Sequence, residues 1–173
     1  FNWNKIGIKY SMIEQRTRKL CHIELDEKSI IRRNVDIEHE RRVAIFDLLE
    51  TNRFSPKSDL TNNDPGPYRA LLRIEDNRLA IDLKNTDDID LSTIVMPLSP
   101  LRRVIKEYFI VCDSYYSAVK TASPQKIEAI DRGRRSLHNE GSQILLEGFS
   151  DKVHIDFETA RRLFTLICVL QIR

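Results

Sequence analysis

The chain has 173 residues, 41% hydrophobic and 31% charged, a balance typical of a folded soluble protein of one domain. Its 28 basic and 26 acidic residues leave a net charge of +2, which argues against a protein that coats nucleic acid. Three cysteines without a C-x-x-C pair fit a reducing compartment better than a disulfide framework. We therefore expect a cytoplasmic protein.

From the sequence we expect no secretory signal and no membrane-spanning segment. Residues 1–20 lack the continuous apolar segment of a secretory signal, and the longest apolar run, 163–170, is too short to cross a bilayer. Residues 1–11 show no clean periodicity, and we expect residues 1–19 to form a flexible N-terminal extension in which Met12 is a candidate for the true start. Residues 20–173 are expected to form one α+β domain.

The first regular elements are a strand and a helix. Residues 21–25 alternate between apolar and polar side chains, which predicts a half-buried strand. Apolar residues at helical spacing then predict a helix over 36–50, with Arg41 on its apolar side and Glu38, His39 and Glu40 one turn earlier. His39-Glu40 lacks the second histidine of the H-E-x-x-H motif, so no metal site is predicted.

The middle of the chain predicts a sheet. Residues 52–67 are rich in Asn, Asp, Ser and Pro and are expected to form a loop. Three alternating segments follow, at 68–74, 79–83 and 91–98, with a tight turn at Asp76-Asn77. Together with the first strand they predict an antiparallel sheet of about four strands with one buried face.

Three further helices are predicted, near 100–120, 124–148 and 157–171, with a short strand at 152–155 between the last two. Ser99-Pro100 and Ser123-Pro124 supply a cap and a proline at the first helical position of two of them. The last helix is apolar in nearly every direction, so we expect it to be buried in the core. The predicted fold class is therefore α+β, a sheet covered by about four helices.

The helix over 124–148 has an unusual apolar side. Arg134, His138 and Gly141 lie in the middle of its apolar stripe, Asp131 lies at the edge, and Glu140 is close to His138 in the sequence. Burying an unpaired arginine is very unfavourable, so these groups require acids, carbonyls, water or a ligand. Two interpretations follow: Arg134 pairs with an acid from another helix and fixes the packing, or the residues form a pocket for an anionic group.

No motif identifies a reaction. The chain has no phosphate-binding loop, no dinucleotide-binding glycine motif and no nucleophile elbow, and its histidines and cysteines lack metal-ligand spacing. No cofactor is predicted. The candidate ligand-binding residues are Glu38, His39, Arg41, Asp131, Arg134, His138 and Glu140. The deciding question is whether Arg134, His138, Arg41 and Glu38 or Glu40 converge on an open cleft.

Several segments together resemble a known family. They are Glu38-His39-Glu40-Arg41 before Ala44-Ile45-Phe46, Ile127 to Asp131, Gly133 to Gln143, Asp156-Phe157 and Thr159 to Leu170. Over roughly residues 20–173 the chain resembles the bacterial "uncharacterised protein family 0262". The resemblance implies a small bacterial cytosolic domain and, because the family has no assigned activity, supplies no catalytic residues. Residues 1–11 lie outside the usual extent of the family, which favours Met12 as the start.

Three functional hypotheses remain. The first is a non-enzymatic binding or regulatory module that takes an anionic small molecule or a partner protein at the Arg/His/acid site. The second is a hydrolase or transferase acting on a phosphorylated or acidic substrate, with His138 as general acid or base. The third is nucleic-acid binding through adjacent arginines, ranked last because the chain is nearly neutral. These arginine pairs are Arg32-Arg33, Arg41-Arg42, Arg102-Arg103, Arg134-Arg135 and Arg161-Arg162.

Overall fold

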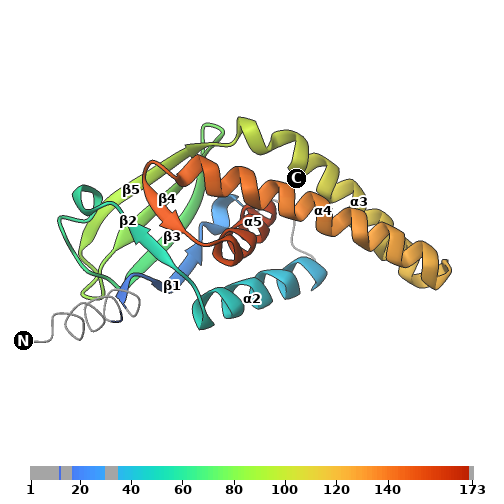
Figure 1. The fold of residues 1–173 in the computed structure, drawn as a ribbon, viewed down its shortest axis with the longest axis horizontal. Helices are drawn as coiled ribbons and strands as arrows, with labels where there is room; N and C mark the ends of the chain where they lie inside the picture. Colours follow the sequence, from blue (N-terminus) through green and yellow to red (C-terminus); the bar gives the residue numbers. More distant parts are fainter. Residues whose placement is uncertain (1–11, 13–16, 30–34, 172–173) are drawn as a thin grey trace, which may run out of the picture.

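The structure is a computed structural model that describes Met12 and residues 17–29 and 35–171. A four-stranded sheet carries helices on one face, which confirms the predicted α+β class (Figure 1). The expected flexibility of residues 1–19 falls largely outside the described residues. The described part of that segment joins the body, since the amide of Phe54 donates to Arg18 O and the amide of Tyr68 to Lys19 O, at 3.0 and 2.8 Å.

The sheet has the strand order β1-β3-β4-β5. Its strands are β1 (Leu20–Leu25), β3 (Tyr68–Glu75), β4 (Arg78–Lys84) and β5 (Asp90–Pro97). Asp76 and Asn77 both have positive φ, 49° and 58°, which gives the tight turn predicted between β3 and β4. The β3–β4–β5 meander is antiparallel as expected. The prediction that the first strand is also antiparallel is wrong. β1 pairs with β3 in parallel, so the sheet is mixed.

The parallel pairing follows from what separates the two strands. The chain between β1 and β3 contains α2 (Val35–Glu50), a long enough crossover to return the chain in the same direction. Short 3-10 turns lie at Glu27–Ser29, Ser58–Leu60 and Ser99–Leu101. The predicted loop over 52–67 also contains a three-residue strand, β2 (Phe54–Pro56), which pairs antiparallel with β6 (Val153–Ile155). This pairing joins segments about 100 residues apart, so local patterns could not predict it.

The core lies between the sheet and the last helix, α5 (Phe157–Gln171). Residues Leu163, Phe164 and Leu166 to Leu170 of α5 are at most 3% exposed, which agrees with the prediction that this helix is buried. It packs against α2 and α4. Helix α5 is therefore packed against other elements on several sides, as expected for a helix with apolar side chains in nearly every direction.

Helices α3 (Arg102–Thr121) and α4 (Pro124–Phe149) form an antiparallel hairpin that extends beyond the sheet and α5 (Figure 1). Ser123 caps α4, since the amide of Lys126 donates to Ser123 Oγ at 3.4 Å. Among the described helices none has a stretch long and apolar enough to span a membrane.

Candidate functional site

A cleft of about 450 Å³ opens between α2, α4 and α5. Tyr108 of α3 also contributes to its lining. The lining residues are His39, Glu40, Val43, Ala44, Asp47, Tyr108, Arg134, Arg135, His138, Arg161, Arg162 and Thr165. The residues that interrupt the apolar stripe of α4 therefore face a hollow rather than a closed helix–helix contact.

Arg134 is held by an acid of its own helix. Its Nε and Nη2 both donate to Asp131 Oδ1, at 2.9 and 2.8 Å, and its guanidinium lies 5.5 Å from the ring centre of Tyr115. Burial lowers the pKa of Arg134, but the hydrogen bonds that its guanidinium donates to Asp131 and Tyr108 outweigh this effect and raise the pKa above the ordinary arginine value. The predicted acid partner exists, but it lies three residues earlier on α4 and not on another helix.

The other cleft arginines share carboxylates. Arg135 Nε lies 3.2 Å from Asp131 Oδ2, so Asp131 serves Arg134 and Arg135 together. Arg161 and Arg162 both pair with Glu158, at 3.8 and 2.6 Å. Arg162 Nε is buried without a hydrogen-bond partner. We call Arg134, Arg135, Arg161 and Arg162 the basic wall: four guanidinium groups share two carboxylates and retain unused N–H donors.

His138 lies at the base of the cleft and is 8% exposed. Its Nε2 is 2.9 Å from Thr165 Oγ1, and the Thr165 hydroxyl is 3.3 Å from the carbonyl of Arg161, to which it donates. This network assigns the ring hydrogen to Nε2 and leaves Nδ1 as a buried acceptor without a partner. Burial, followed by the charges of Arg161 and Arg134, lowers the pKa of His138 to about 4. The imidazole is therefore neutral at pH 7.

Gly141 gives room to an aromatic ring next to His138. A Cβ at Gly141 would lie 2.2 Å from Cε2 of Phe164, closer than any real contact allows. The Phe164 ring packs edge-on against His138, with ring centres 5.2 Å apart, and Tyr108 lies 5.5 Å from the same imidazole. The group that approaches Gly141 closely is therefore a core side chain.

The side of the cleft formed by α2 is acidic. Glu40 and Asp47, which we call the acidic wall, lie seven residues apart and both line the cleft. Glu40 Oε1 accepts a hydrogen bond from the Tyr116 hydroxyl at 2.6 Å. Within the described part of the chain, no hydrogen bond or ion pair is found for the Asp47 carboxylate.

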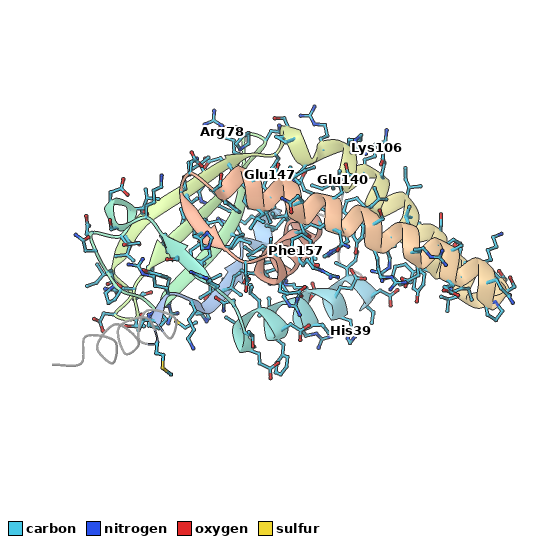
Figure 2. The ribbon with its side chains drawn as sticks, in the orientation of Figure 1. His39, Arg78, Lys106, Glu140, Glu147 and Phe157 are labelled. Carbon is cyan, nitrogen blue, oxygen red and sulfur yellow. The ribbon has the colours of Figure 1, made fainter. Side chains whose placement is uncertain are left out.

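The seven predicted site residues do not all meet. Arg134, His138 and His39 line the cleft, and Asp131 holds Arg134. Arg41 and Glu38 lie outside the lining: Arg41 pairs with Glu27 and Glu38, at 3.3 and 3.6 Å. Glu140 pairs with Arg103 of α3, and Figure 2 shows it on the side of α4 away from His39.

The sequence did not single out Asp47, Tyr108, Arg135, Arg161, Arg162 and Thr165 as site residues. One signal was available for α5. Arg161, Arg162 and Thr165 lie one turn apart on a helix that is otherwise apolar, the same kind of interruption that identified Arg134 and His138 on α4.

A second hollow, of about 360 Å³, lies over the face of the sheet opposite the helices. Its charges are largely paired within the sheet: Asp82 accepts from Arg73 at 2.8 Å and from Thr93 at 2.6 Å. Asp88 lies 3.7 Å from both Arg69 and Lys84. Since these groups satisfy one another, the hollow offers fewer open contacts than the cleft. No group of three metal-ligating side chains occurs among the described residues.

Comparison with known proteins shows to which protein family the chain belongs. The profile of the uncharacterised protein family UPF0262 matches residues 17–173. The chain belongs to this family. A UPF0262 protein of Azorhizobium caulinodans is 53% identical over 155 residues, covering 88% of this chain and 93% of the relative. UPF0262 proteins of Agrobacterium fabrum and Erythrobacter litoralis are 51% and 50% identical, over 88% and 90% of the chain and 94% and 97% of the relatives.

No solved structure matches the chain. The UPF0262 relatives are bacterial, as the sequence resemblance implied, and their names state family membership without an activity. The cleft itself is therefore the feature of this UPF0262 protein from which a function can be inferred.

Proposed function

We propose that the cleft between α2, α4 and α5 binds a small anionic molecule through the basic wall. The observation that carries the proposal is the sharing of two carboxylates, Asp131 and Glu158, by four guanidinium groups. Each shared carboxylate leaves one positive charge uncompensated at its pair of arginines. Guanidinium groups bind carboxylates and phosphates through paired N–H donors, so the unused donors suit an anion.

The size of the cleft favours a small molecule over a partner protein. Its volume of about 450 Å³ lies within the range of small-molecule pockets, roughly 300–1,000 Å³. The described arginine pairs do not form one basic surface either. Arg102-Arg103 begin α3, and Arg103 pairs with Glu107 and with Glu140, so they stand apart from the cleft. This separation weakens the nucleic-acid hypothesis, which needs a continuous basic surface; Arg32-Arg33 lie outside the described residues.

The chemistry of His138 supports binding better than catalysis. With a pKa of about 4 the imidazole is neutral at pH 7, so His138 has no imidazolium proton to donate as a general acid there, and it is a weak general base. Its Nε2 is engaged by Thr165 and its Nδ1 is buried. In the binding role, the neutral ring fills the base of the cleft between Tyr108 and Phe164.

Isothermal titration with phosphate, pyrophosphate and citrate tests the proposal. We expect saturable binding to the wild type that weakens with added salt, because partly exposed charges are screened. Arg135→Gln is expected to weaken binding about tenfold, the effect of one hydrogen bond to a charged group. Arg132→Gln is the matched control on the same helix, since Arg132 is 72% exposed, pairs with Glu128 and lies outside the cleft.

The expected pattern separates a specific site from general charge attraction. If Arg135→Gln and Arg132→Gln weakened binding equally, the anion would be bound through net charge alone, and the specific site would be overturned. No saturable binding of any of the three anions to the wild type would overturn the proposal.

A further inference from the structure

The two sides of the cleft carry opposite charge. The basic wall comes from α4 and α5, and the acidic wall, Glu40 and Asp47, comes from α2. Among the described residues, no ion pair or hydrogen bond joins a carboxylate of the acidic wall to a guanidinium of the basic wall. Opposite charges thus face a shared hollow without direct contact.

Each wall is held by its own neighbours. Arginines of the basic wall pair with Asp131 on α4 and Glu158 on α5. On the acidic wall, Glu40 accepts from Tyr116 of α3. Groups able to contact a ligand remain on both sides: Arg135 is 56% exposed although it pairs with Asp131, and no partner for the Asp47 carboxylate is found within the described residues. The walls therefore do not depend on each other, and both retain groups able to contact a third molecule.

A simple anion satisfies only one side. Bound to the basic wall, the anion adds a third negative charge near Glu40 and Asp47, in a partly desolvated cleft where repulsion between like charges is stronger than in water. A protonated amine on the same molecule converts this repulsion into attraction and gives the carboxylates N–H donors.

We propose that the ligand is a small dipolar molecule, with a carboxylate or phosphate at the basic wall and a protonated amine at the acidic wall. This inference rests on the proposed anion site and specifies the class of molecule that the site takes. The base of the cleft, formed by His138, Tyr108 and Ala44, contacts the linking part of the molecule without adding charge at pH 7.

Matched pairs of probes test the inference by isothermal titration at low ionic strength. Phosphoethanolamine is compared with ethyl phosphate, and γ-aminobutyrate with butyrate, so that the members of each pair differ only in the amine. We expect the amine-bearing member to bind about fivefold more tightly, the gain from one partly exposed ion pair. The two pairs also distinguish a phosphate ligand from a carboxylate ligand.

Asp47→Asn is expected to bring the affinity ratio within each pair close to one. Glu50→Gln is the matched control, because it removes the same charge from an exposed position of α2 outside the cleft and should leave the fivefold ratio in place. A ratio of one in the wild type, or an equal loss in both variants, overturns the dipolar ligand while the anion site stands. No binding of any probe overturns both proposals.

Discussion

The Nε2 of His138 on α4 lies 2.9 Å from the hydroxyl oxygen of Thr165 on α5. This hydrogen bond connects two of the three helices that form the cleft, and both of its residues line that cleft. It also fixes the orientation of an imidazole that has no partner for its other nitrogen.

Replacing Thr165 with valine keeps the side-chain shape and removes this acceptor. We expect Thr165→Val to lower the free energy of unfolding by about 1–3 kcal/mol, because both imidazole nitrogens are then buried without partners. Urea unfolding followed by circular dichroism measures the change. Thr121→Val is the control, since Thr121 is exposed at the end of α3 and substitutions at such sites stay within about 0.5 kcal/mol. Equal stability of the two variants would contradict the assigned contact.

The stability of the protein should depend on His138 in mildly acidic solution. The folded pKa, about 4, lies below the ordinary value of 6.5, so the unfolded chain binds the proton more tightly. The stabilising effect of the neutral ring is therefore complete above about pH 6.5 and is lost as the pH falls towards 4. The total loss attributable to His138 is about 3 kcal/mol.

Urea unfolding of the wild type and of His138→Gln at several pH values between 4 and 7.5 isolates this contribution. The wild type should lose about 3 kcal/mol more than the variant across the range, because the variant lacks the titrating ring. His154→Gln, at an exposed position of β6, should follow the wild type. Parallel curves for the wild type and His138→Gln would show that the ring is not buried as described.

Replacing each of two glycines of α4 with alanine should change the stability of the protein in opposite directions. A Cβ added at Gly133 would meet nothing within 4 Å, so Gly133→Ala should stabilise the protein by about 1 kcal/mol through helix propensity. At Gly141 the Cβ would meet the Phe164 ring at 2.2 Å, so Gly141→Ala should destabilise by about 1–3 kcal/mol through overpacking. Thermal unfolding of both variants is the measurement. A stabilising Gly141→Ala would mean that Phe164 moves freely.

Asn52 links the end of α2 to the first strand. Its Oδ1 accepts from the amide of Leu20 at 2.7 Å, and its Nδ2 donates to the carbonyls of Leu20 and Leu48 at 2.9 and 2.7 Å. Asn52→Ala removes all three bonds and should lower the free energy of unfolding by about 2–4 kcal/mol, since backbone groups of a buried residue lose their partners. Chemical denaturation compares it with Asn139→Ala, at an exposed position of α4, which should change little.

Most of the fold follows from local patterns. The alternation in residues 68–98 and the helical spacing in the last two helices predict β3 to β5, α4 and α5 near their observed bounds. The parallel partner of β1 and the β2–β6 pair could not be predicted in this way, because both depend on contacts between segments that lie far apart in the chain.

Local patterns likewise predicted some residues of the candidate site and not others. Arg134 and His138 were found because they interrupt the apolar stripe of their own helix. Arg41 also lies on an apolar side, but it pairs with Glu38 of its own helix and with Glu27 of the preceding 3-10 turn, and it does not line the cleft. Asp47 and Arg135 had no such signal, because exposed-looking charges become site residues only when two helices place them around one hollow.

The β2–β6 pair has a consequence for the proposed binding cleft. β2 follows α2 and β6 precedes α5, and the amide of Arg53 beside this pair donates to the Thr159 hydroxyl at 3.0 Å. The β2–β6 pair, which lies outside the cleft, thus holds the end of α2 near the start of α5. Helix α2 carries the acidic wall, and α5 carries Arg161 and Arg162 of the basic wall. If the cleft binds the proposed ligand, substitutions at Thr159 would alter how far the two helices stand apart and so alter its affinity without contacting it.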